Sequence, residues 1–247
     1  MCETCGCGHP HDSSPAHDAA HAHGHEHSHD HAHDHAPPVR TLNVNQPALA
    51  LNQRFADQNR GWFRAKALTV FNLLSSPGSG KTTLLERTLR DLPGSAAIVG
   101  DLQTENDARR LRASGAQAIQ ITTGATCHLD AHMVAHVLDK LDTSGLRFLF
   151  IENVGNLVCP ASYDLGETRR VVLLSVTEGE DKPLKYPVIF RTADLVLVAK
   201  CDLAEAVGFD RAQALANIRQ AAPKAQMLEI SSKTGAGLQN WYAWLRD

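Results

Sequence analysis

The sequence predicts an α/β domain in which helices cover both faces of a mostly parallel sheet, preceded by a disordered His-rich metal-binding tail. Three observations support this class. From residue 67 onward, short apolar runs alternate with helical patterns, an order typical of βαβ units. Two of these runs, 171–176 and 195–199, are almost wholly apolar, as strands buried on both faces are. The first run leads into a Gly-rich turn that is followed by a helical pattern.

That Gly-rich turn is the segment 75–83, SSPGSGKTT, between a predicted strand 67–74 and a predicted helix 82–91. A strand, a Gly-rich loop and a helix start in this order predict a phosphate-binding loop, so the domain is expected to be a P-loop NTPase. Gly78 and Gly80 allow the backbone to turn tightly and to direct N–H groups at phosphate, and the positive end of the helix adds to this attraction.

The end of the loop supplies the groups expected to act on a nucleotide. Lys81 can reach the β- and γ-phosphates, and the Thr82 hydroxyl can bind Mg²⁺. Ser75 stands where the usual G-x-x-x-x-G-K-S/T pattern has its first Gly, which loosens the match but leaves G-S-G-K-T-T intact. The loop residues expected to bind nucleotide are Pro77, Gly78, Ser79, Gly80, Lys81, Thr82 and Thr83.

The remaining elements are expected on both sides of this loop in the sequence. Before it, 52–66 is predicted to be an amphipathic helix with Phe55, Trp62 and Phe63 as its apolar contacts. After it, Pro93 and Gly94 end the first helix. The further predicted strands are 96–100, 116–121, 148–152, 171–176, 195–199 and 226–230. The further predicted helices are 104–113, 129–141, 210–221 and 238–245.

Composition limits the classes of function. The formal net charge is −3, but residues 1–38 contain six acidic residues and no Lys or Arg. The rest of the chain therefore has 21 acidic and 24 basic residues. No basic stripe interleaved with aromatic residues is present, and nucleic acid is therefore not an expected partner. No apolar run is long enough to span a membrane, and the N-terminus lacks the apolar region of a secretory signal. A cytoplasmic location without a membrane partner is expected.

Residues 1–38 are predicted to be a disordered metal-binding tail. Cys2, Cys5 and Cys7 lie close together, so three thiolates can close on one Zn²⁺ or Ni²⁺ with little loss of chain entropy. Eleven His residues follow between His9 and His35, and they are expected to hold several ions weakly in a solvated segment. The alternatives are a redox-active thiol cluster, and a plain linker or an expression tag. The expected divisions are the tail 1–38, a lead-in segment and helix 39–66, and the P-loop domain 67–247.

Acidic residues follow two predicted strands, at the edge where parallel sheets bind ligands. Asp101 can coordinate Mg²⁺ or position the attacking water, and its alternative is a carboxylate near a helix N-terminus. Glu152 and Gly155 belong to an ENVG turn, where the backbone can sense the γ-phosphate and Glu152 can hold Mg²⁺ through water. The alternative is a simple turn at the strand end. The residues interpreted as catalytic are Lys81, Thr82, Asp101 and Glu152.

The residues after the last two predicted strands indicate guanine selection. The Asp202 carboxylate can accept N1–H and N2–H₂ of guanine, which adenine does not offer, and the stem of Lys200 can lie along the base. Ala199 replaces the Asn usual before this Lys, so selection depends mainly on Asp202 and the affinity is expected to be reduced. The alternative is a surface turn. The loop expected to touch guanine O6 is Ser231, Ser232 and Lys233.

A second candidate metal site lies in the body of the chain. Cys127 and His128 follow one predicted strand and Cys159 follows the ENVG turn, and such soft ligands bind Ni²⁺ or Zn²⁺. One chain supplies only three ligands, so a water or a dimer would complete the shell. Because Cys159 is four residues past Gly155, we expect metal affinity or dimer geometry to depend on nucleotide state. The alternative is buried structural Cys with a core His.

Two further imidazoles follow this segment. His132 and His136 lie four and eight residues after His128, so the three side chains share one helix face. The face is interpreted either as a second transfer station for metal or, more simply, as the partly exposed side of an amphipathic helix.

Together these motifs resemble the HypB family, the nickel-incorporation GTPases of hydrogenase maturation. The resemblance runs from CETCGC through the P-loop, the GD, TCHLD and ENVGNLVCPASYDL segments, to Gly237. It implies a GTPase that uses Mg²⁺, forms a GTP- and metal-dependent homodimer and helps insert Ni²⁺ into the [NiFe]-hydrogenase large-subunit precursor. It also implies a partner, a small zinc-containing nickel chaperone. The implied metal ligands are Cys2, Cys5, Cys7, Cys127, His128 and Cys159, and the implied guanine-reading residue is Asp202.

Two other functions are kept as alternatives. A urease-accessory nickel GTPase has a similar loop but would be expected to carry a Cys-Pro-His motif, whereas this chain has Cys127-His128 and a separate Cys159. A nickel storage or buffer protein with a weak GTPase core fits the tail, although the intact Lys81 and Thr82 argue against it. Turnover is expected to be slow, because no arginine finger or water-positioning Gln is identifiable in the sequence.

Overall fold

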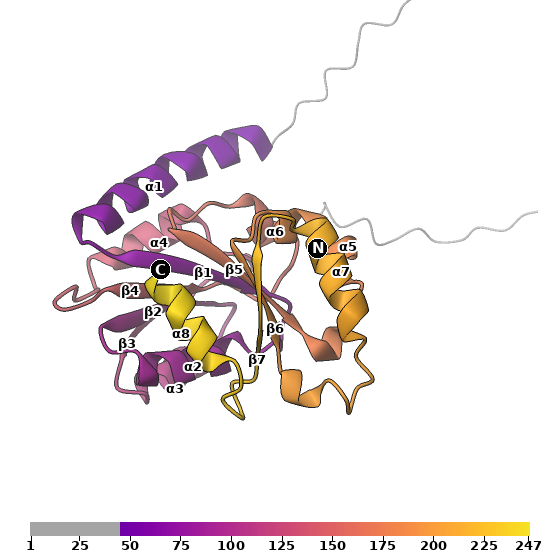
Figure 1. Cartoon of the computed structure of the whole chain (residues 1–247). Coiled ribbons are helices and arrows are strands. Elements are labelled where there is room, and N and C mark those ends of the chain that lie inside the picture. The colour runs from indigo at the N-terminus through magenta and orange to yellow at the C-terminus, as the bar shows by residue number, and fades with distance from the viewer. Residues whose placement is uncertain (1–44) are drawn as a thin grey trace, which may run out of the picture. The chain divides into compact units, whose positions relative to one another are not determined.

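The computed structural model describes residues 45–247 (Figure 1). The predicted tail 1–38, with its thiol site at Cys2, Cys5 and Cys7 and its eleven His residues, lies outside the described residues. The first part of the predicted lead-in segment, residues 39–44, lies outside them as well.

The described chain forms one parallel sheet of seven strands. The strands are β1 (Thr69–Ser75), β2 (Ser95–Asp101), β3 (Gln117–Thr122), β4 (Phe148–Glu152), β5 (Arg169–Ser175), β6 (Leu195–Ala199) and β7 (Gln226–Ile230). Their order in the sheet is β3-β2-β4-β1-β5-β6-β7, and all six neighbouring pairs are parallel. β1 therefore lies in the interior of the sheet between β4 and β5 (Figure 1). This confirms the predicted α/β class.

Helices cover both faces of this sheet (Figure 1). The α-helices are α1 (Asn45–Ala65), α2 (Lys81–Asp91), α3 (Asn106–Arg112), α4 (Ala131–Leu138), α5 (Lys182–Lys185), α6 (Pro187–Arg191), α7 (Arg211–Ala221) and α8 (Leu238–Arg246). Short 3₁₀ turns occur at η1 (Cys159–Ser162), η2 (Val176–Glu178) and η3 (Cys201–Leu203).

Alternation along β1 divides the core into two layers, because successive side chains of a strand point to opposite faces. Phe71 and Leu73 pack with buried residues of α2, α3 and α8. Val70 packs on the opposite face with α1 and α4, and Leu74 packs there with α6 and α7. The apolar runs of the sequence are thus buried from both sides, as their composition predicted.

Local backbone and capping residues set several boundaries that the pattern placed differently. Asp130 accepts a hydrogen bond from the Met133 backbone N–H at 2.7 Å, so α4 begins at Ala131 rather than at 129. Ala67 has φ 54° and turns the chain after α1, so β1 begins two residues later than predicted. α5 and α6 were not predicted; both are very short. Within residues 45–247, no helix combines the length and apolarity needed to cross a bilayer.

Side-chain amides hold α1 beside the start of α4. Asn59 Nδ2 donates to the carbonyls of Ala131 at 2.8 Å and Leu165 at 3.1 Å, and Asn52 Oδ1 accepts from the Ala131 N–H at 2.8 Å. Buried hydrogen bonds of side-chain amides fix the orientation of the helix, because a buried polar group left without its partner would cost free energy. They place α1 next to the segment that contains Cys127 and His128.

Candidate nucleotide-binding and metal site

The Gly-rich segment leaves β1 at the interior of the sheet and turns into α2. Gly78 and Gly80 have φ of 74° and 103°, values that residues with a Cβ rarely adopt. α2 then begins at Lys81, so the first N–H groups of the helix lie at the end of the loop. The predicted strand, loop and helix are therefore all present in the order that a phosphate-binding loop requires.

Lys81 is buried beneath this loop. Its Nζ donates to Ser75 Oγ at 2.8 Å, and burial lowers the pKa of Lys81 from its ordinary value. A buried ammonium benefits strongly from an anionic partner, which a phosphate group would supply. Ser75 thus has a role that the sequence pattern did not reveal, because its hydroxyl holds Lys81 in place where the usual motif has Gly.

Glu152 lies against the Thr82 hydroxyl. Thr82 Oγ1 donates to Glu152 Oε1 at 2.6 Å, while Glu152 Oε2 is buried and has no hydrogen-bond partner among the described residues. Burial raises the pKa of Glu152 from 4.5 to about 7, against the opposing effect of the Lys81 charge. A hydroxyl, a carboxylate and an unsatisfied oxygen beside a phosphate loop suit Mg²⁺, which is bound through few protein oxygens and several waters.

A cavity of about 430 Å³ lies over this group. The predicted site residues that line it are Pro77, Gly78, Gly80, Lys81, Thr82, Thr83, Asp101, Glu152 and Gly155. The Asp101 carboxylate accepts two hydrogen bonds from its own loop, one from the Leu102 N–H and one from Thr104 Oγ1 at 2.6 Å. Two charged residues that line it were not predicted, Asp107 and Arg110 on α3. The signal that could have found them is their charge on the helix that follows Asp101.

Gly155 explains why the ENVG turn and the phosphate loop lie together. A Cβ on Gly155 would lie 2.8 Å from the Pro77 Cα, so only glycine allows this approach without a shift of one loop. A movement of the phosphate loop at Pro77 would therefore displace the ENVG turn directly.

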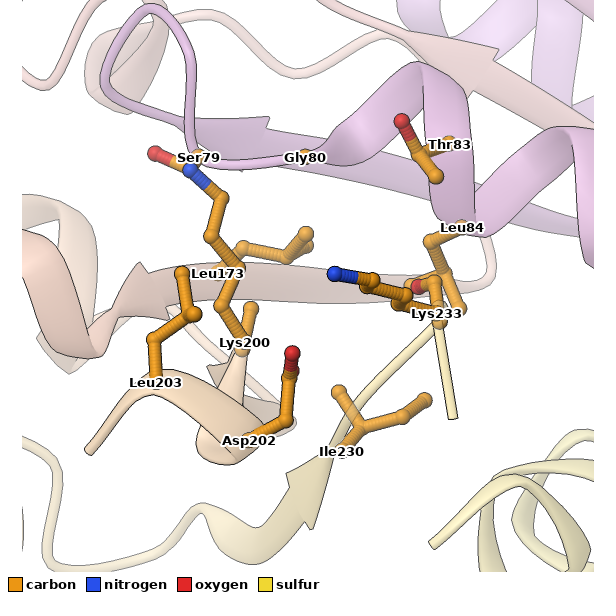
Figure 2. A pocket seen from close by; sticks show the side chains of 12 residues that line it. Ser79, Gly80, Thr83, Leu84, Leu173, Lys200, Asp202, Leu203, Ile230 and Lys233 are labelled. Carbon is orange, nitrogen blue, oxygen red and sulfur yellow. The ribbon is translucent and has the colours of Figure 1, made fainter. Parts of the chain in front are cut away.

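A second cavity, of about 200 Å³, lies between the phosphate loop and the ends of β6 and β7. Figure 2 shows Asp202 and Lys233 directed into it, and Lys200 Nζ donates to the Gly78 carbonyl at 2.7 Å. Ser79 and Ser232 also line the cavity. The structure thus brings most of the predicted base-binding residues together.

Ser231 does not belong to that group. Its hydroxyl accepts from the Thr234 N–H at 3.1 Å, and it lines neither of the two cavities. Its position indicates that it holds the shape of the loop that carries Ser232 and Lys233.

The three predicted metal ligands in the body of the chain converge. The candidate ligand atoms of Cys127, His128 and Cys159 all lie within 4.8 Å of one another. His128 Nδ1 is buried and has no hydrogen-bond partner within residues 45–247, and the ring packs on Tyr163 with centroids 4.0 Å apart. Burial lowers the pKa of His128, which favours the neutral imidazole that binds metal. Two thiols and an imidazole with an unsatisfied nitrogen fit Ni²⁺ or Zn²⁺.

His132 and His136 form a separate pair on α4. Their Nε2 atoms lie 3.1 Å apart, both residues are exposed, and the His132 ring contacts Phe55 with centroids 4.6 Å apart. Within the described residues, the cluster of three metal ligands does not include them. The predicted helix face of three imidazoles is wrong for His128, which precedes α4. The remaining pair lies on an exposed side of the helix, and its role as a transfer station stays a prediction.

One segment connects the phosphate cavity to the metal ligands. Asn153, next to Glu152, accepts from the Leu129 N–H at 3.0 Å, and Asn156 Nδ2 donates to the Cys127 carbonyl at 3.3 Å. Residues 152–159 therefore contact Thr82 at one end and supply Cys159 at the other.

Comparison with known proteins agrees with this geometry. Residues 69–229 match the family model described as CobW/HypB/UreG, nucleotide-binding domain. "Hydrogenase maturation factor HypB" from Azotobacter vinelandii is 52% identical over 209 residues, covering 83% of this chain and 69% of that protein. The crystal structure of HypB from Archaeoglobus fulgidus has a TM-score of 0.75 and 44% identity, covering 80% and 98%. The structure of HypB from Helicobacter pylori in complex with nickel has a TM-score of 0.76 and 43% identity, covering 79% and 93%.

Proposed function

Because this chain belongs to the CobW/HypB/UreG family, and resembles its HypB members over most of its length, we propose that it is a GTP-hydrolysing nickel metallochaperone. It delivers nickel into the large subunit of [NiFe]-hydrogenase during maturation. The names of its relatives, hydrogenase maturation factors, and a structural neighbour in complex with nickel support this assignment. They do not favour a urease-accessory or a storage role.

One observation carries the proposal: a single segment, 152–159, lies between a phosphate loop and a nickel-compatible cluster. Glu152 bonds to Thr82 at the nucleotide end, and Cys159 belongs to the ligand cluster at the other end. A loop that contacts the γ-phosphate region changes position when that phosphate is lost. We expect GTP binding to set the geometry of the cluster, and hydrolysis to relax it and promote metal transfer.

The nucleotide end is proposed to work as follows. GTP lies on residues 77–83 with its base against Asp202, and Lys81 offsets charge that develops on the phosphates. Mg²⁺ would be held by the Thr82 hydroxyl and, through water, by Glu152, and when bound it neutralises phosphate charge. Asp101 orients water or metal. Turnover is expected to be slow, because among residues 45–247 no glutamine lines the phosphate cavity to position the attacking water.

Nickel is the cargo of the cluster formed by Cys127, His128 and Cys159. A water, or the same cluster of a second copy in a homodimer, completes its coordination. Zn²⁺ suits the same ligands and is proposed as a competing occupant. The tail thiols and His residues are proposed to hold further ions, and the partners are a small zinc-containing nickel chaperone and the hydrogenase large-subunit precursor.

GTP hydrolysis and Ni²⁺ binding by Lys81→Ala test the proposal. The variant is expected to lose hydrolysis, because the phosphates lose their buried cation, while Ni²⁺ remains bound to the thiols and imidazoles of the chain. Lys140→Ala, which removes an exposed Lys after α4, is the control and is expected to keep both activities. Absence of GTP hydrolysis in the unchanged protein would contradict the proposal.

A further inference from the structure

We propose that Arg110, on α3, binds the α-phosphate of the nucleotide and so contributes to the affinity for GDP and GTP alike. The inference rests on the proposed function in one respect, that the ligand of the two cavities is a guanine nucleotide. Neither the P-loop pattern nor the resemblance assigned a role to this residue.

Thr83 marks the place of the α-phosphate. It lines both the base cavity and the phosphate cavity, and Figure 2 shows it on the first turn of α2 at the edge of the base cavity. A nucleotide that fills both cavities therefore passes Thr83 with the group that joins the ribose to the β-phosphate. The Thr83 N–H belongs to the first turn of α2, where N–H groups have no partner within the helix and are available to an anion.

The Arg110 guanidinium lies beside Thr83. Its Nη2 is 3.5 Å from Thr83 Oγ1 and 2.9 Å from Glu86 Oε2, and its Nη1 is 3.7 Å from Asp107 Oδ1. Glu86 and Asp107 thus hold the group at the rim of the phosphate cavity, which Arg110 lines. A guanidinium has five N–H donors, so several stay available for phosphate oxygens, which Arg binds well in a two-point geometry.

The position separates this role from two others. Lys81, Thr82 and Glu152 occupy the end of the cavity where the β- and γ-phosphates are expected, whereas Arg110 has its nearest loop contact at Thr83. An α-phosphate contact is present with either nucleotide and does not act on the bond that is broken. The second alternative is a structural role, in which Arg110 only joins α3 to α2 through Glu86. The Glu86 variant distinguishes this role from phosphate binding.

Dissociation constants for GDP and a non-hydrolysable GTP analogue, measured on the full-length protein, test the inference. Arg110→Ala is expected to weaken both nucleotides by a similar factor of about ten, the effect of one charge-assisted hydrogen-bonded contact at a partly exposed site. The kcat at saturating GTP should stay within about twofold, while KM rises. Arg110→Lys keeps the charge without the planar fork and should lose less. Arg109→Ala, an exposed neighbour on α3, should retain wild-type affinity. Glu86→Ala leaves the guanidinium in place but removes one of its two carboxylate partners, so it should lose less affinity than Arg110→Ala.

Three outcomes would overturn the inference. Loss of affinity for the GTP analogue alone would move Arg110 to the γ-phosphate. A loss in Glu86→Ala equal to that in Arg110→Ala would show that the residue acts by joining the two helices. Unchanged affinity in both Arg110 variants would remove it from the site. If the unchanged protein bound neither nucleotide, the proposed function would fail as well, and this result is distinct from the other three.

Discussion

Replacing Glu152 with Gln is expected to stabilise the nucleotide-free protein increasingly as pH rises from 5 to 7, and by a nearly constant amount above pH 7. Burial raises the pKa of Glu152 from 4.5 to about 7 in the folded protein. Between these values the folded chain keeps a proton that the unfolded chain releases, so the stability of the wild-type protein falls as pH rises through this window. At about 1.4 kcal/mol per pKa unit, the loss is about 3 kcal/mol by pH 8.

Gln is a neutral side chain of the same size, and it resembles the protonated carboxyl group that the fold favours. Gln can still accept the hydrogen bond that Thr82 donates to Glu152. The free energy of unfolding is measured by urea denaturation from pH 5 to pH 8.5, with a chelator and without nucleotide. Glu205→Gln, which neutralises an exposed carboxylate, controls for the change in net charge.

The difference between Glu152→Gln and the wild-type protein should grow with pH and level off above pH 7. A difference that is constant across this range would refute the reasoning, because burial would then not be linked to protonation. A variant less stable than the wild type at pH 8 would refute it too, since the ionised carboxylate would then have a stabilising partner.

Two further substitutions test the nucleotide contacts. Gly155→Ala places a Cβ 2.8 Å from the Pro77 Cα, so we expect the loops to separate and the affinity for a GTP analogue, measured by titration, to fall by about tenfold or more. Unchanged affinity would show that the loops move apart freely. Asp202→Asn removes the carboxylate that is directed into the base cavity, so we expect the preference for GTP over ATP, measured by competition, to fall by about tenfold or more. An unchanged preference would place guanine selection elsewhere.

The sequence was most informative where the chemistry is local. The phosphate loop could be predicted because its glycines, its Lys and the helix start are consecutive residues, and their geometry follows from the chain itself. The convergence of Cys127, His128 and Cys159 could be predicted as well, since their loops follow strands of one parallel sheet and such strand ends share an edge. Both predictions depended on spacing rather than on packing.

The features that escaped prediction depend on how helices pack. Arg110 lies on a short polar helix whose sequence pattern indicates only an exposed surface. Its approach to Thr83 follows from the contact between α2 and α3. The bond between Ser75 and Lys81 was missed because Ser75 appeared only as a departure from the pattern. Ser231 was expected at the base but bonds within its own loop, a local preference of Ser that competes with ligand contact.

Ni²⁺ binding at equilibrium tests the central claim, that the nucleotide controls the metal cluster. The full-length protein would be titrated with Ni²⁺ under GDP and under a non-hydrolysable GTP analogue, beside Cys127→Ala and Cys159→Ala, so that binding by the tail is common to all samples. We predict one class of sites whose affinity differs between the two nucleotides and which is absent from both variants. Equal affinities under GDP and the analogue, or a nucleotide effect that persists in the variants, would contradict the claim.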